Sequence, residues 1–320
     1  MKVHFSHDVI ICTSKRNETL FETIHSLDLH KHHRYLKLYV VVNGYDENLI
    51  SQLEKALKES LPTAIVIRSE PGLVSARNLA LKESSSEIVT FLDDDVTLGE
   101  DFFRNLDDQF SKHPAVIGMS PRIKYLYLDR PLSKIITRFR FLQKSNLPRK
   151  VFNFGRLTSW ARNNWFPDIE IESQICDWLP GCCMSFRRDS IKGIFFNSNL
   201  QNGPTGGYAL GEDADFSMRV NSRGILLLNS TSVILHRQAP SVRDDLVKME
   251  EARGYWNSYL VRNFPERFSL IRIFIYNLFR ICVKWVKKPT EIIKFKGAFA
   301  FFMGFFAERR HEHLGRIPKT

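Results

Sequence analysis

Cysteine, glycine and proline are all scarce in this chain of 320 residues. Its five cysteines form no C-x-x-C pairs with histidine partners, so neither a disulfide scaffold nor a structural zinc site is expected. A reducing compartment fits best. The 16 glycines and 13 prolines are too few for a low-complexity or collagen-like protein. With 43% apolar and 25% charged residues, the composition is that of an ordinary globular protein.

Long apolar runs are missing as well. The best candidate, residues 297–307, has 11 residues, which is too short to span a bilayer. The first twelve residues lack the apolar core and the small-residue cleavage site of a signal peptide. We therefore expect neither a secreted protein nor a simple integral membrane protein.

Positive charge is abundant, but it is unevenly placed. Residues 262–320 hold 13 Lys and Arg against 4 Asp and Glu, a net charge of +9 out of +11 for the whole chain. Residues 1–261 are therefore nearly neutral. A basic tail of this kind favours an anionic partner, either a lipid headgroup surface or a nucleic acid.

The first half of the chain alternates two kinds of pattern. Short apolar runs predict strands, and segments with helical spacing separate them, at residues 8–13, 17–29, 36–42, 49–61, 64–67, 72–84, 87–92, 100–111 and 116–119. This alternation predicts βαβ units and a mainly parallel sheet. Ligands of such sheets bind at the carboxyl ends of the strands, so the residues after positions 12, 42, 67 and 92 are expected to face one crevice.

The second half is less regular, and residues 125–175 show no clear pattern. We expect a strand at residues 182–186, a helix at 212–222, a strand in two parts at 225–235 and an amphipathic helix at 244–262. The composition becomes basic and aromatic near Arg262, which is where we place a boundary.

Three aspartates follow the predicted strand at residues 87–92. Side chains alternate along a strand, so Asp93 and Asp95 are expected to point the same way. Two carboxylates placed like this suit a hard divalent cation, which in turn neutralises a diphosphate leaving group. A solvated acidic turn is the competing interpretation. The repulsion among three adjacent carboxylates favours the metal site.

Three segments together resemble glycosyltransferase family 2: Thr13-Ser14-Lys15-Arg16-Asn17, Gly72 to Asn78, and Phe91 to Asp95. The resemblance extends over about residues 8–240. It implies a GT-A fold and inversion at the anomeric carbon. It also implies that Asp93 and Asp95 bind Mn²⁺ or Mg²⁺ and the diphosphate of a nucleotide sugar, with Asp94 beside the ribose or the sugar.

Donor recognition is where the chain departs from the family. The family often has an Asp that contacts the base where this chain has Val42, so base recognition falls to Asn43 or Asp46, or differs. Arg77 either pairs with the acidic cluster or a phosphate, or lies on a helix surface. The residues we expect to bind the nucleotide sugar are Thr13, Arg16, Asn43, Asp46, Arg77, Asp93 and Asp94.

Two later segments also resemble the family. Residues 178–188 resemble the segment that lines the donor sugar and the acceptor, where Gly181 permits close approach and Trp178 either stacks on a sugar or packs in the core. Residues 211–216 resemble the E-D element. There Asp213 is the candidate base for the acceptor hydroxyl, and Glu212 is assigned to the acceptor or sugar. Acidic residues at a helix start are also explained by the helix dipole, and both roles can hold together.

His236 follows the last predicted strand. Some family members place a histidine there as a third metal ligand, so the expected metal ligands are Asp93, Asp95 and His236. A structural histidine is the alternative.

The tail combines aromatic and basic residues. Residues 264–306 contain 12 aromatics, and within 270–288 the basic residues fall near one side of a helix while Ile271, Phe274 and Ile275 lie on another. This pattern is typical of a helix in a membrane interface. Packing of the same helix on the protein's own core is the competing interpretation.

Together these observations predict an α/β protein with a GT-A domain at residues 1–262, divided near residue 120 into a nucleotide-sugar half and an acceptor half, and an amphipathic tail at 263–320. The expected function is inverting, metal-dependent sugar transfer from a nucleotide diphosphate sugar to a lipid-linked or oligosaccharide acceptor in surface polysaccharide biosynthesis. We expect the protein at the cytoplasmic face of the cell membrane, with residues 264–306 on an anionic surface.

Other functions remain as alternatives. A sugar nucleotidyltransferase or another phosphotransfer enzyme lacks support, because no Gly-rich pyrophosphorylase loop or P-loop follows the first strand. A nucleotide-sugar or nucleic-acid-binding protein without transferase activity is the remaining alternative. The Phe-rich face opposite the basic one argues against nucleic acid as the partner.

Overall fold

The computed structural model describes most of the chain. It covers residues 4–125, 155–161, 173–201, 210–237, 246–287 and 296–306, apart from residues 15–16, 29, 31–35, 45, 62, 158, 160 and 297–298. Most of the irregular segment 125–175 therefore lies outside the described residues.

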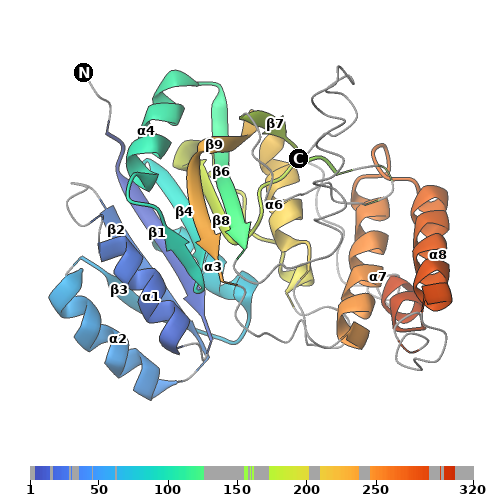
Figure 1. Cartoon of the computed structure of the whole chain (residues 1–320), viewed down its shortest axis with the longest axis horizontal. Coiled ribbons are helices and arrows are strands. Elements are labelled where there is room, and N and C mark those ends of the chain that lie inside the picture. Colours follow the sequence, from blue (N-terminus) through green and yellow to red (C-terminus); the bar gives the residue numbers. More distant parts are fainter. Residues whose placement is uncertain are drawn as a thin grey trace.

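A single mixed sheet forms the centre of the molecule (Figure 1). Its first four large strands are parallel and run in the order β3-β2-β1-β4. These strands are β1 (His7–Thr13), β2 (Leu36–Asn43), β3 (Ile65–Ser69) and β4 (Ile88–Asp93). The helices between them are α1 (Asn17–Asp28), α2 (Glu47–Ser60) and α3 (Leu73–Glu83). The predicted βαβ alternation is confirmed.

The strands after β4 complete the sheet mostly with antiparallel pairings. The added strands are β5 (Val96–Leu98), β6 (Val116–Tyr125), β7 (Gln174–Cys176), β8 (Cys183–Arg187) and β9 (Ile225–His236). β8 lies antiparallel between β4 and β6, and β9 pairs parallel with β6. The parallel arrangement therefore holds for β1 to β4, whereas the whole sheet is mixed.

Two details differ from the sequence-based expectation. The pattern at residues 225–235 suggested two parts, but β9 is one strand whose pairing with β6 shifts register between Pro121 and Arg122. The three-residue strand β5 was not predicted. It pairs antiparallel with the end of β9, and this pairing shapes the site described below.

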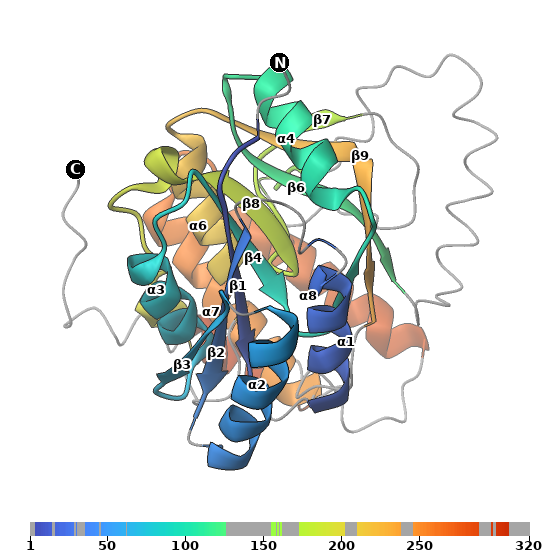
Figure 2. The ribbon, with the colours of Figure 1, turned by 90° about the vertical axis from the view of Figure 1, so that its left-hand side faces the viewer.

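Alternating side chains of the strands feed two core clusters, one on each face of the sheet. Val9 and Ile11 pack with α1, α2 and α4 (Phe102–Lys112), whereas Ile10 packs on the opposite face with α3 and α6 (Glu212–Asn221). Figure 2 shows α1 and α2 in front of the sheet, with α6 behind it. Two short 3₁₀ helices, Arg188–Ile191 and Ser198–Leu200, follow β8.

A third cluster joins the C-terminal helices α7 (Leu246–Asn263) and α8 (Leu270–Lys287) to the sheet domain. Phe268 and Ile273 are buried in it together with Trp178 and with Tyr259 of α7. The boundary expected at residue 262 thus falls inside a continuous apolar cluster. The division into two domains there stays a prediction.

Residues 299–306 form a further helical segment that lies against α7. A Cβ atom at Gly254 would lie 1.9 Å from the Phe301 carbonyl oxygen, and one at Gly304 would lie 1.9 Å from the Glu251 carbonyl oxygen. The two backbones can approach this closely only because both positions are glycine. Phe301 and Phe305 are buried in the contact.

The other side of these C-terminal helices is apolar and exposed. The exposed side chains, which we call the apolar surface, are Leu270, Ile271, Phe274, Ile275, Leu278, Phe279, Phe299, Met303 and Phe306. The rings of Phe274 and Phe302 lie 6.0 Å apart, which brings the two helices together. Within the described residues, no helix is both long enough and apolar enough to cross a membrane.

Candidate active site

The carboxyl ends of the parallel strands meet at one edge of the sheet, as the sequence predicted. Thr13 ends β1, and its hydroxyl donates a hydrogen bond of 2.6 Å to the Asp94 carboxylate after β4. Asn43 ends β2, and its side-chain oxygen accepts a hydrogen bond of 2.5 Å from the backbone N–H of Gly72. The loops after β1, β2 and β4, together with the start of α3, therefore share one site.

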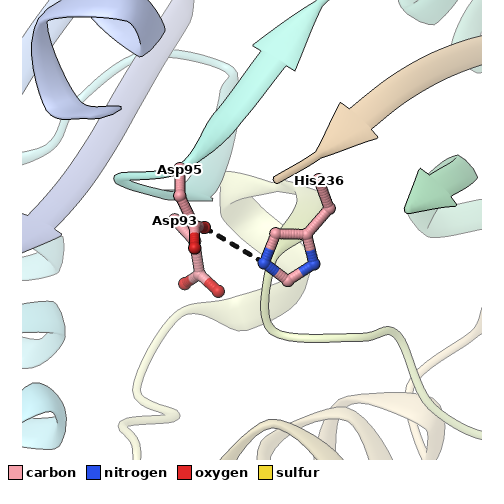
Figure 3. Close-up of side chains that lie close together, drawn as sticks. All are labelled: Asp93, Asp95 and His236. Carbon is pink, nitrogen blue, oxygen red and sulfur yellow. Dashed lines mark ion pairs between the residues drawn. The ribbon is translucent and has the colours of Figure 1, made fainter. Parts of the chain in front are cut away.

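Asp93, Asp95 and His236 form a cluster at this edge (Figure 3). Each offers one ligand atom, and the three atoms lie within 4.8 Å of one another. The His236 Nε2 atom lies 3.0 Å from Asp95 Oδ1. Asp95 and His236 are buried, while Asp93 is half-buried. Among the described residues, this is the one group of three or more such side chains that could hold a metal ion.

The unpredicted strand β5 explains why His236 joins the two aspartates. Val96 pairs with His236 across β5 and β9, and the backbone N–H of Arg237 donates to the Asp95 carbonyl at 2.9 Å. The Nδ1 atom of His236 is buried and has no hydrogen-bond partner among the described residues. Two carboxylates and an imidazole are a donor set that fits a divalent cation such as Mn²⁺.

Arg77 of α3 lies between this cluster and the start of α6. Its side chain donates to Asp93 Oδ1 at 3.3 Å, to Glu212 Oε1 at 3.2 Å and to the Gly181 carbonyl at 3.0 Å. The residue is only 3% exposed. Burial disfavours the charged form, but Glu212 and Asp93 outweigh it and raise the pKa of Arg77 above its ordinary value.

Asp213 lies in the first turn of α6, beside Gly181. Its Oδ2 atom accepts a hydrogen bond of 2.8 Å from the Gly181 backbone N–H. A Cβ atom at position 181 would lie 3.3 Å from both Arg77 and Asp213, so the glycine allows the close approach. Gly211 precedes α6 with φ of +85°, a conformation that favours glycine. Asp213 is half-buried, which keeps it within reach of solvent.

The other predicted residues are placed as follows. The side chain of Asp46 accepts from the Leu49 N–H at 3.0 Å and so caps α2, while Asn43 is engaged by Gly72. Trp178 is 6% exposed and packs in the third core cluster. Arg16 lies outside the described residues. The binding roles predicted for these residues stay predictions.

The adjacent cysteines Cys182 and Cys183 pack in the core. Cys182 and Cys183 are buried, and burial raises the pKa of both thiols, so neither is a thiolate at neutral pH. Burial likewise raises the pKa of Cys12 to about 12. A thiolate ligand at the site is not expected from these three residues.

Sequence reasoning missed two polar contacts that support the site. Gln201 accepts hydrogen bonds of 2.7 Å from both the backbone N–H and the hydroxyl of Ser75 at the start of α3. Tyr259 of α7 donates to Asp215 of α6 at 2.7 Å. The partners are 126 and 44 residues apart in sequence, and no local pattern marks such pairs.

Comparisons with known proteins agree with this geometry. The sequence matches the family model "Glycosyl transferase family 2" over residues 8–195. Comparison with curated proteins found no match. Among solved structures, that of S. aureus TarS residues 1–349 is 16% identical with a TM-score of 0.52, covering 80% of this chain and 65% of that one.

Two further solved structures are similar. GalNAc-T7 with UDP, GalNAc and Mn²⁺ is 16% identical with a TM-score of 0.56, over 88% of this chain and 56% of that chain. The mannosyltransferase PcManGT from Pyrobaculum calidifontis, in complex with GDP-Man and Mn²⁺, is 14% identical with a TM-score of 0.53. The match covers 99% of this chain and 77% of that chain. The chain thus spans less than two thirds of the length of the TarS and GalNAc-T7 chains.

The sheet, its flanking helices and the strand-end carboxylates define a protein of the GT-A glycosyltransferase fold. The family match covers more than half of the sequence. The chain therefore belongs to glycosyl transferase family 2.

Proposed function

We propose that the protein is an inverting, metal-dependent transferase that moves a sugar from a nucleotide diphosphate sugar to a saccharide acceptor. The observation that carries this proposal is the Asp93–Asp95–His236 cluster, linked through Arg77 and Gly181 to the half-buried carboxylate of Asp213. Similar solved structures contain UDP with GalNAc or GDP-Man, each with Mn²⁺, which supports a nucleotide-sugar donor and a divalent cation.

Each part of the site has a defined task in such a reaction. Asp93, Asp95 and His236 would hold Mn²⁺ or Mg²⁺, and the bound cation supplies neutralisation of the charge that builds on the diphosphate leaving group. Thr13 orients Asp94 beside this position. The half-buried Asp213 accepts the proton of the acceptor hydroxyl as its oxygen bonds to the anomeric carbon.

Inversion follows from a single displacement. The acceptor oxygen forms its bond to the anomeric carbon on the face opposite the departing diphosphate, through a transition state with oxocarbenium character. One carboxylate base is sufficient for that step. The Gly181 N–H holds Asp213 Oδ2 at 2.8 Å and so fixes the orientation of the carboxylate in the site.

We further propose that the acceptor is a lipid-linked saccharide and that the protein works in surface polysaccharide synthesis at the cytoplasmic face of the cell membrane. Two features support a peripheral location. The segment 262–320 has a net charge of +9, and the apolar surface of α8 and residues 299–306 is exposed to solvent. A lipid-linked acceptor would be presented at the same membrane.

Calorimetric titration tests the transferase proposal. UDP, GDP, dTDP and CDP are titrated into the full chain, each with and without Mn²⁺ or Mg²⁺. Metal-dependent binding of one nucleotide is expected and identifies the base of the donor. The matching nucleotide sugars are then screened for transfer, and NMR of the product is expected to show an inverted anomeric configuration. Failure of all four nucleotides to bind, or retention in the product, contradicts the proposal.

A further inference from the structure

Arg77 contacts both halves of the candidate site at once. We propose that Arg77 is a positioning residue: it holds the metal ligand Asp93 and the base Asp213 in a fixed relation and does not itself bind the donor. The inference rests on the proposed function, because it takes these two aspartates as the metal ligand and the base. Its argument comes from the contacts of the Arg77 guanidinium.

On the metal side, one terminal nitrogen of Arg77 lies 3.3 Å from Asp93 Oδ1. A carboxylate has two oxygens, so a carboxylate held through one of them keeps the other for a cation. Side chains that orient metal ligands in this way tune metal affinity without touching the metal. Arg77 thus fixes the rotamer of Asp93 from outside the Asp93–Asp95–His236 cluster.

On the base side, the same nitrogen donates to the Gly181 carbonyl at 3.0 Å, and the Gly181 N–H donates to Asp213 Oδ2 at 2.8 Å. The other terminal nitrogen contacts Glu212, the residue before Asp213, at 3.2 Å. Arg77 therefore holds the first turn of α6 at two points. A displacement of its guanidinium would move the base relative to the metal ligands.

The side chain is built into the protein rather than offered to a ligand. It is 3% exposed, and its guanidinium lies 5.4 Å from the centre of the Phe196 ring. Asn78, the next residue of α3, exchanges two hydrogen bonds of 2.8–2.9 Å with the backbone of Phe196. One terminal nitrogen of the guanidinium contacts Glu212, and the other contacts Asp93 and Gly181, whereas a lysine has a single nitrogen that cannot occupy both positions.

The test compares Arg77→Lys with the wild type by three readouts: binding of Mn²⁺ alone measured by electron paramagnetic resonance, binding of metal-free nucleoside diphosphate by calorimetry, and kcat of transfer. We expect Mn²⁺ affinity to fall about tenfold or more. We expect kcat to fall about 100-fold because the base is misplaced. Metal-free nucleotide affinity should stay within about twofold, since Arg77 does not touch the donor.

A matched control is Arg223→Lys. Arg223 lies just after α6, at the opposite end of that helix from Glu212 and Asp213, and donates to the Ser190 and Lys192 carbonyls. This variant should have the Mn²⁺ affinity and kcat of the wild type. If Arg77→Lys does not fold, Gly181→Ala replaces it, because its Cβ would crowd both Arg77 and Asp213 at 3.3 Å. That variant should reproduce the loss of kcat.

Two results would overturn the inference. If metal-free nucleotide affinity falls as much as kcat, Arg77 binds the donor directly. Unchanged Mn²⁺ affinity and kcat in a folded variant remove the positioning role. Failure of the proposed function is distinguishable, because a wild-type protein without transfer activity still reports the effect of Arg77 on Mn²⁺ binding.

Discussion

Five carboxylates lie close together at the site, and each has a polar partner within the described residues. The pairs are Asp93 and Glu212 with Arg77, Asp94 with Thr13, Asp95 with His236, and Asp213 with the Gly181 N–H. Each partner places a hydrogen-bond donor or a positive charge next to a carboxylate, which offsets the repulsion among like charges in this small volume. A divalent cation at the cluster would add further attraction, so metal binding should stabilise the folded protein.

Asp95 gives the first prediction at the scale of single residues. Asp95→Ala removes a buried ligand atom from the three-residue cluster, so Mn²⁺ affinity should fall by at least about 100-fold and metal-dependent nucleotide binding should be lost. In the wild type, Mn²⁺ should raise the unfolding temperature, and in the variant it should not. Asp101→Ala, at an exposed surface ion pair, is the control. Undiminished Mn²⁺-dependent nucleotide affinity in Asp95→Ala would refute the site.

Asp213 gives the second prediction at the scale of single residues. Asp213→Asn keeps an oxygen that can accept from Gly181 but removes the basic carboxylate. Donor binding should therefore remain while kcat falls by about 10²–10⁴-fold. Calorimetry and initial rates on the same preparation separate the two effects. Near-normal turnover would show that another group accepts the proton.

At the scale of elements, α6 is held in place by α7. The hydroxyl of Tyr259 donates to Asp215 at 2.7 Å and accepts from Asn197 at 2.8 Å, while Arg219 also pairs with Asp215. Burial, together with Asp215, raises the pKa of Tyr259 above its ordinary value. Its hydroxyl therefore stays protonated, and a donor, at neutral pH.

Tyr259→Phe tests this connection. Asp215 would lose a hydrogen bond to an ionised acceptor, which contributes about 1.5–3 kcal/mol, so the free energy of unfolding should fall by that amount. Tyr39→Phe is the matched control, because its hydroxyl donates to the neutral Glu83 carbonyl and should cost about 0.5–1.5 kcal/mol. Urea unfolding measures both. Equal losses in the two variants would contradict the role assigned to Asp215.

The helices and strands of the first half could be predicted because their signals are local. The apolar run at 8–13 and the helical spacing at 72–84 match β1 and α3 within a residue or two. The strand β5 could not be predicted, because three residues after an acidic turn carry no periodicity. Its pairing with β9 is a tertiary event, and that pairing is what brings His236 to Asp95.

The candidate site shows the same contrast between local sequence signals and contacts that only the folded chain reveals. Asp93 and Asp95 are neighbours in sequence, so their convergence followed from the end of a strand. Arg77 and Glu212 lie 135 residues apart, and only the folded sheet shows that they meet. Base recognition was expected from Asn43 or Asp46, or by a different route; Asp46 caps α2, and its binding role stays a prediction.

At the scale of the whole molecule, the C-terminal segment is part of the protein body as well as an exposed surface. The C-terminal segment has an inner and an outer side: Phe268 and Ile273 pack inward, as the core interpretation predicts, while Ile271 and Phe274 are exposed. The membrane-interface role of the exposed side stays a prediction. Deleting the segment would therefore also remove core contacts. Point substitutions separate the two roles more cleanly.

Gly254→Ala tests the inward side. The added Cβ would overlap the Phe301 carbonyl, so residues 299–306 must move away from α7. Overpacking of this kind costs about 1–3 kcal/mol. Hydrogen exchange should show faster exchange at 299–306, and Gly304→Ala should have a similar, non-additive effect because it disrupts the same contact. Additive losses in the double variant would contradict a shared contact.

The apolar surface on the outer side of the C-terminal helices gives the last prediction. Phe279 and Ile271 are 66% and 70% exposed, so replacing them with Glu removes no core packing but adds charge to the apolar surface. Transferring one such side chain into the interface contributes up to about 1.5–3 kcal/mol, so each substitution should weaken binding to vesicles of anionic phospholipid by about ten- to 100-fold. Ile175→Glu, at 51% exposure on β7, is the control and should bind like the wild type.

Sedimentation with vesicles at two salt concentrations distinguishes the partners of this surface. Lipid binding that needs both the apolar side chains and the net charge of +9 in residues 262–320 should weaken at high salt and fall in Phe279→Glu. If the apolar surface instead joins two copies of the chain, Phe279→Glu would convert a dimer to a monomer in light scattering and leave vesicle binding unchanged. That result would contradict the membrane location while leaving the transferase proposal intact, because nucleotide and Mn²⁺ binding depend on the Asp93–Asp95–His236 cluster and not on the exposed apolar side chains.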